Sequence, residues 1–182
     1  SRAGYDVGLN YKRTFTKNMP RTSFYDIGAH VWGDLEVLPG YQNVASPIKN
    51  IQALTVTYGL SKLRKTLGGV IDEKGYEWTL NAAGYMAGGA VYPSIVSTQN
   101  AGFLVPGIRN TSFWLRNSIG QSFGNKNSAL SKFYFGGFRN NYIDWQPSEQ
   151  YRLGEAFAGA KIDELDAYNY VKTMAELNLK PL

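Results

Sequence analysis

The stretch Ile51-Gln-Ala-Leu-Thr-Val-Thr-Tyr-Gly-Leu-Ser61 alternates between large apolar residues and small or polar ones. Its even positions from 54 to 60 carry Leu, Val, Tyr and Leu, and its odd positions from 53 to 61 carry Ala, Thr, Thr, Gly and Ser. A period of two is typical of a β-strand, whose successive side chains point to opposite faces. An apolar face opposite a face of small polar residues suits a wall between lipid and water, so the stretch predicts a membrane β-barrel.

The composition favours an all-β architecture and excludes several kinds of site. The 182 residues include 20 Gly, 13 Tyr, 9 Phe, 4 Trp and no Cys, which excludes disulfides, cysteine zinc sites and thiol nucleophiles. No run approaches the ~18 consecutive apolar residues of a spanning helix, and the mean hydropathy is −0.31. The net charge of +5 comes from scattered Lys and Arg, which indicates solubility and a water-filled lumen rather than nucleic-acid binding.

Seven stretches of the chain show this alternation and are predicted to be strands. They cover residues 5–14, 23–31, 51–62, 76–86, 92–104, 111–123 and 167–179, of which 92–104 alternates least clearly. Each is roughly 9 to 13 residues long, which suffices for a tilted strand to cross a bilayer. Strands of soluble sandwiches are nearer to about 5 or 6 residues.

The connections between these stretches alternate in length. The connections around 17–20, 67–72 and 106–109 are short, whereas those at 34–50 and 124–166 are long. Counting the strands along the chain places the two long connections together at the opposite end of the strands from these short ones. The connection at 88–91 is short and does not follow the pattern. Bacterial barrels have short periplasmic turns and longer outer loops. Aromatic residues towards the strand ends suggest an interfacial girdle; they include Tyr5, Tyr25, Tyr76, Trp78 and Trp114.

An odd number of strands cannot close a usual bacterial barrel, and an open sheet edge in lipid leaves backbone groups unpaired. We therefore expect residues 1–182 to form an antiparallel transmembrane β-barrel segment that is one part of a longer barrel. The long outer loop of this segment is expected at 124–166.

The most distinctive sequence motif of the chain lies in this long loop. It reads Lys132-Phe-Tyr-Phe-Gly-Gly-Phe-Arg-Asn-Asn-Tyr-Ile-Asp-Trp145. A Gly-Gly pair lets the backbone pack closely, while the flanking aromatic rings anchor it on both sides. A structural role is therefore favoured over ligand binding for this motif.

From about residue 112 to the end, the chain resembles the bacterial surface antigen family, the barrel superfamily of outer-membrane assembly factors and two-partner secretion transporters. Phe133-Tyr-Phe-Gly-Gly137 is similar to the family's Phe-x-x-Gly-Gly motif, and Met174-Ala-Glu-Leu-Asn-Leu-Lys-Pro181 to its returning strand. Asn140-Asn-Tyr142 and Phe157-Ala-Gly159 look closer to a branch with a Tol-B-like periplasmic β-propeller before the barrel. The resemblance implies a barrel of about sixteen strands. It also implies a structural loop motif made of Phe133, Phe135, Gly136, Gly137, Phe138, Asn140, Asn141 and Tyr142.

The family's loop tip carries an Arg that locks inside the lumen. Its Arg-Gly-Phe/Tyr motif is not present as written here, and the nearest equivalent is Arg152 with Phe157 and Gly159. On the inner face, Glu176 is placed to pair with Arg116 or with Arg152, which would fix the loop electrostatically.

The remaining candidate residues favour no enzyme chemistry. His30, with Asp26 four residues before it on the same face of the strand, is interpreted as a solvated lumen residue, and the acidic residues Asp163, Glu164 and Asp166 as a solvated loop rather than a calcium site. The sequence contains no residue pattern typical of a catalytic triad or of a phosphate-binding loop. We expect no enzyme activity, no cofactor and no metal.

The resemblance implies insertion or transport of polypeptides at the bacterial outer membrane. Its expected partners are outer-membrane lipid, other strands of the same barrel or partner subunits, and a polypeptide substrate. Two alternatives stay open from the residues, namely a passive channel or structural barrel subunit of a larger complex, and a soluble β-sandwich that binds carbohydrate through its aromatic residues.

Overall fold

The computed structural model describes residues 2–37, 48–65, 72–108, 111–136, 156–157, 159–161 and 164–179. Within them the long strands are β1 (Arg2–Thr16), β2 (Arg21–Val37), β3 (Ile51–Arg64), β4 (Lys74–Ala87), β5 (Ala90–Leu104), β6 (Ser112–Ser122) and β9 (Asn169–Asn178). The short elements are the 3-10 turn η1 (Ala129–Ser131), β7 (Phe133–Phe135) and β8 (Leu165–Ala167).

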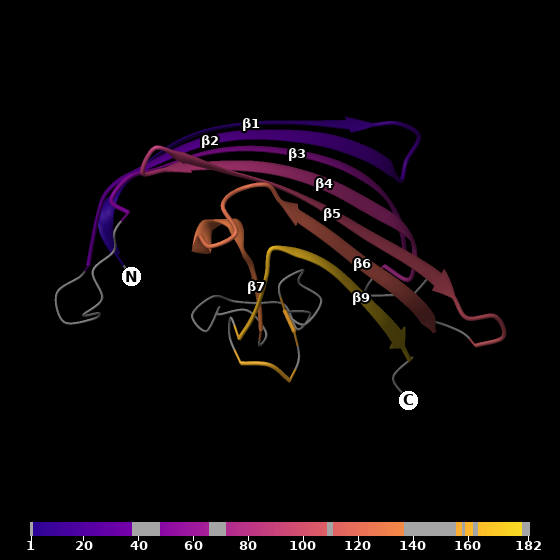
Figure 1. The fold of residues 1–182 in the computed structure, drawn as a ribbon. Coiled ribbons are helices and arrows are strands. Elements are labelled where there is room, and N and C mark those ends of the chain that lie inside the picture. The colour runs from indigo at the N-terminus through magenta and orange to yellow at the C-terminus, as the bar shows by residue number, and fades with distance from the viewer. Residues whose placement is uncertain are drawn as a thin grey trace.

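The seven long strands form one antiparallel sheet in the order β1-β2-β3-β4-β5-β6-β9, and this sheet arches over the short elements (Figure 1). The predicted all-β, antiparallel fold is confirmed, since each predicted strand corresponds to one long strand. Even β5, whose sequence alternates least clearly, pairs along its length with both β4 and β6. The sheet is open across the described residues, with β1 and β9 as its two edges.

The period of two gives the arch an apolar outer face and a polar inner face. The register places Val56 beside Ile27 and Ala82 on the outer face. Thr57, the next residue, lies beside Asn81 on the inner face and accepts a hydrogen bond of 2.7 Å from its side-chain amide. Exposed large apolar side chains of the outer face include Val7, Leu9, Ile27, Val31, Leu54, Val56, Tyr58, Met86, Val91, Ile95, Phe103, Phe113, Leu115, Ile119, Val171 and Leu177.

Glycine residues on the inner face leave room for aromatic rings from the neighbouring strand. A Cβ atom added to Gly120 would lie 2.1 Å from the ring of Tyr170, which is its cross-strand partner. A Cβ atom added to Gly102 would lie 2.6 Å from the ring of its partner Trp114. Rings that cover glycine in this way fill the concave face without crowding it and shield the backbone below.

The assignment of Trp114 to an interfacial girdle is wrong, because its side chain belongs to the inner face. Trp114 is only 3% exposed, and its indole Nε1 donates a hydrogen bond of 3.2 Å to Ser112 Oγ. Its position near a strand end suggested the girdle, but the period of two places it on the same face as Ser112 and Arg116.

Two connections are shorter than the sequence predicts. β2 continues past Val31 to Val37, since Gly33 accommodates the ring of Tyr5 and the backbone N–H of Leu35 donates to the carbonyl of Lys49 at 3.0 Å. The turn between β4 and β5 consists of Gly88 and Gly89, with φ of 59° and 81°. Positive φ at both positions is the requirement of the tightest β-hairpin turns, and glycine meets it without strain.

The segment after β6 returns to the concave side of the sheet, where Figure 1 shows η1 and β7 beneath the arch. Ser128 caps η1 by accepting a hydrogen bond of 3.3 Å from the backbone N–H of Leu130. β7 pairs with β8, with Phe133 opposite Ala167. The part of the chain described here contains no helix of the length and apolarity needed to cross a membrane.

Candidate functional site

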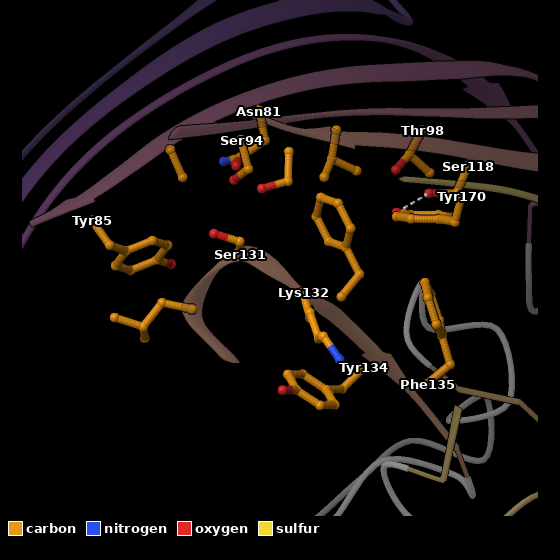
Figure 2. Close-up of a pocket in the computed structure, with 15 residues that line it drawn as sticks. Asn81, Tyr85, Ser94, Thr98, Ser118, Ser131, Lys132, Tyr134, Phe135 and Tyr170 are labelled. Atoms are coloured by element: carbon orange, nitrogen blue, oxygen red, sulfur yellow. Dashed lines mark hydrogen bonds between the residues drawn. The ribbon is translucent and has the colours of Figure 1, made fainter. Parts of the chain in front are cut away.

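Tyr170 of β9 joins the loop to the inner face of the sheet. Its ring makes edge-to-face contacts with Phe133 and Phe135, with ring centroids 4.9 and 4.6 Å away. Its hydroxyl lies 2.8 Å from Ser118 Oγ, as Figure 2 shows, and Gly120 lies beneath the ring. Each aromatic contact adds about 0.5–1.5 kcal/mol beyond its buried area, so this ring is the main attachment point of the loop.

Lys132 connects the two short strands through an ion pair. Its Nζ lies 2.5 Å from Asp166 Oδ2, beside the pairing of β7 with β8. The hydrogen bond that Lys132 donates to Asp166, and then the charge of that carboxylate, raise the pKa of Lys132 above its ordinary value of 10.5. Both side chains are partly exposed to solvent, so the pair orients the strands more than it stabilises them.

Two further hydrogen bonds hold the connection between β6 and β9, one joining its two ends to each other and one joining its middle to β9. The Tyr168 hydroxyl donates a hydrogen bond of 2.8 Å to the carbonyl of Gly124. Lys172 Nζ donates to the carbonyl of Ala156, whose side chain is buried. Hydrogen bonds therefore hold the loop where it leaves β6, where it enters β9, and at Ala156 between these two points.

Part of the predicted loop motif lies at this attachment. Phe133 and Phe135 contact Tyr170, and Phe135 and Gly136 are both buried. The other predicted motif residues lie outside the described residues, and these are Gly137, Phe138, Asn140, Asn141 and Tyr142.

The predicted loop tip is described at two of its three positions. Phe157 is exposed and lines a cavity of about 370 Å³ together with Phe135 and Leu165. Gly159 is exposed and has a φ of 93°. Arg152 lies outside the described residues.

Arg116 and Glu176 form an ion pair on the inner face. Arg116 Nε donates to Glu176 Oε2 at 3.0 Å, and the Arg116 guanidinium lies 4.7 Å from the centre of the Trp114 ring. Of the two partners expected for Glu176, Arg116 is thus the one seen in the described residues. The pair joins β6 to β9 beside the loop attachment.

Of the remaining titratable candidates, His30, Glu164 and Asp166 have structural partners, and Asp163 lies outside the described residues. His30 Nδ1 lies 3.3 Å from Asp6 Oδ1, not beside Asp26, and its ring stacks on Trp32 at 5.4 Å. Glu164 accepts a hydrogen bond from the backbone N–H of Lys161. Within the described ranges, no three His, Asp or Glu side chains gather as a metal site would require.

Three important residues of this site are absent from the sequence-based candidates, namely Ser118, Gly120 and Tyr170. The alternation within residues 111–123 did place Ser118 and Gly120 on the predicted inner face. What the sequence did not show was that Tyr170 of a distant strand lies across from Gly120.

The arrangement offers hydroxyls, aromatic rings and one paired lysine, which suit holding and binding better than bond-making chemistry. The site is a loop held against the concave face of a sheet whose opposite, outer face is mainly apolar. Neither a protein-family model, nor a curated protein sequence, nor a solved structure matches this chain significantly.

The substitution Gly120→Ala tests the attachment of Tyr170. We expect it to lower the free energy of unfolding by about 1–3 kcal/mol, the usual cost of overpacking, because the ring held by Phe133 and Phe135 cannot move away from the new methyl group. The measurement is denaturant unfolding of the full chain in detergent micelles.

Gly59→Ala is the matched control. Its added Cβ atom would lie 2.2 Å from the ring of Phe24, but Phe24 is on β2, which three strands separate from β6, and its ring lies beneath Lys12 of β1. Equal losses from the two substitutions would show that the loop does not hold Tyr170 in place.

The raised pKa of Lys132 gives the loop attachment a dependence on alkaline pH. The contribution of the ion pair is fully present below the ordinary lysine pKa of 10.5 and is lost as the pH rises through the higher folded-state value. We therefore expect wild type to be more stable than Asp166→Asn at about pH 8 and the difference to shrink as the pH rises through the folded-state pKa of Lys132. A difference that stays constant across this range would exclude Lys132 as the partner responsible.

Proposed function

We propose that this chain forms part of an outer-membrane β-barrel that inserts or transports polypeptides at the bacterial outer membrane. The observation that carries the proposal is the contrast between the two faces of the sheet. Leu9 is 78% exposed and Val171 74% exposed on the outer face. These residues stand at opposite edges of a sheet whose outer face is mainly apolar, with a few polar side chains such as Gln99 and Asn117 among the apolar ones. Large contiguous apolar surfaces of this kind mark contact with lipid or with other proteins.

The lengths of the strands support a lipid environment. β3 and β4 each span 14 residues, whereas a tilted strand needs about 9–11 residues to cross the hydrocarbon core. The additional residues extend the strands into the headgroup region on either side. A soluble sandwich would need a second sheet to cover the apolar face, and the described short elements lie on the opposite, polar face.

The two open edges imply further strands. β1 and β9 each pair on one side within the described sheet, and unpaired backbone groups are too costly to leave in hydrocarbon. We propose that strands from the same barrel or from partner subunits complete the wall. Outer-membrane lipid is then the partner of the outer face.

The anchored loop supports a role beyond simple passage of solutes. Its Phe133-Tyr-Phe-Gly-Gly137 text resembles the loop motif of the bacterial surface antigen family, and Phe133 and Phe135 contact the inner face through Tyr170. In the proposed barrel this loop lies in the lumen next to β9. A polypeptide substrate would meet it either in the lumen or at the strand edge.

A passive channel or structural barrel subunit is the second candidate. The same loop supports it, because a loop fixed at several points on the inner face would narrow the lumen of a pore. The two functions differ in whether the barrel acts on another polypeptide.

The substitution Val56→Arg tests whether the outer face contacts lipid. Val56 lies at mid-strand among other apolar side chains, and an arginine facing lipid near the bilayer midplane costs about 2–4 kcal/mol. We expect the variant to lose insertion into phospholipid vesicles, measured by flotation with the lipid and by protection from added protease.

The neighbouring substitution Thr57→Arg is the control, since its side chain faces inward beside Asp26. It should insert like the wild-type chain. Equal insertion of Val56→Arg and Thr57→Arg would contradict a lipid-facing outer surface and favour a soluble sheet.

The proposed action on polypeptides predicts faster folding of a barrel substrate. The probe is a small urea-unfolded outer-membrane barrel protein, added to vesicles that contain the full chain or to empty vesicles. We expect the chain to raise the folding rate, measured by the shift of the folded band in unheated gel electrophoresis. Ion conductance across the vesicles without any change in folding rate would instead support the passive channel.

A further inference from the structure

A cavity of about 600 Å³ lies between the inner face of the sheet and the segment η1–β7. Its floor comes from β4, β5 and β6 and includes Asn81, Ser94 and Thr98, whereas Ser131 and Phe133 close it from the loop side (Figure 2). This volume falls in the range of about 300–1,000 Å³ that is typical of small-molecule sites.

Two buried hydroxyls line this cavity and lack a protein partner. Ser122 is 3% exposed and Ser131 2% exposed, and neither Oγ atom has a hydrogen-bond partner among the residues that the structure describes. A buried hydroxyl left without a partner is unfavourable. Each Oγ atom exposes less than 1 Å² to solvent, so it would gain a partner from a polar ligand in the cavity by rotating toward that ligand.

The chemistry of the lining selects the kind of ligand. The strands of the floor are central in the sheet and are paired on both sides. Their backbone N–H and C=O groups therefore already form hydrogen bonds within the sheet, and only side chains face the cavity. Lys132 is the charged lining residue, and Asp166 offsets its charge. A peptide backbone would find few main-chain partners here, and an ionic ligand would find no net opposite charge.

We propose that this cavity binds a neutral mono- or disaccharide. Hydroxyls from Ser94, Ser122 and Ser131 would pair with the hydroxyls of the sugar. The aromatic rings of Tyr85 and Phe133, which also line the cavity, offer flat faces to its C–H groups. The site does not depend on whether the sheet belongs to a membrane barrel.

The test is saturation-transfer NMR with the full chain in a zwitterionic detergent without a sugar headgroup. The probes are maltose, lactose, trehalose and N,N′-diacetylchitobiose. We expect transfer to at least one of them, and the substitution Ser94→Trp, which fills the floor of the cavity, should abolish it. Transfer to none of the four sugars, or equal transfer with Ser94→Trp, would overturn the proposal.

The substitution Ser131→Ala separates a ligand-binding role from a structural one. Loss of one hydrogen bond to the sugar should weaken its binding about three- to tenfold, while the stability of the chain should stay the same or rise because the buried hydroxyl has no partner to lose. Ser61→Ala, on the inner face of β3 outside the cavity, should bind like wild type. Transfer to trialanine and not to the sugars would assign the cavity to a peptide and also refute the proposal.

Discussion

Close packing on the concave face depends on aromatic rings that lie over glycine. A strongly curved sheet has less room inside than outside, and a ring can lie flat against that face where the residue across from it lacks a Cβ atom. Gly120 beneath Tyr170 and Gly102 beneath Trp114 satisfy this condition. The contact between Tyr170 and the loop strand β7 follows from it, since Phe133 and Phe135 reach a ring that lies flat against the sheet.

The same alternation produces two environments from one set of strands. On the outer face, Val56 lies across from Ile27, and Ile119 lies across from Val171. On the inner face, polar side chains form hydrogen bonds, as in the pair of Asn81 with Thr57. An apolar and a polar environment thus require no separate layers, because the two faces of a single sheet supply both.

The sequence predicted the strands well because their signal is local. The period of two identified every long strand and the face of Thr57, and a possible partner for Glu176 followed from the shared face. It did not identify which strands lie side by side across the long loop, so the contact of Tyr170 with Gly120 was missed. The girdle assigned to Trp114 failed because it used the position along the strand and neglected the face. The choice of Arg116 as the partner of Glu176 is likewise set by the register of β6 with β9, which no local pattern contains.

The loop and the edge strand β9 form one mechanical unit. The loop leaves from β6 and returns into β9, and Tyr170 of β9 is held by the loop residues Phe133 and Phe135. Peeling β9 away from β6 would break the bond of Tyr170 to Ser118, and it would also have to drag the loop along or break the aromatic contacts. Load applied to the loop would in turn pass to the sheet edge, so the opening of this edge and the position of the loop cannot vary independently.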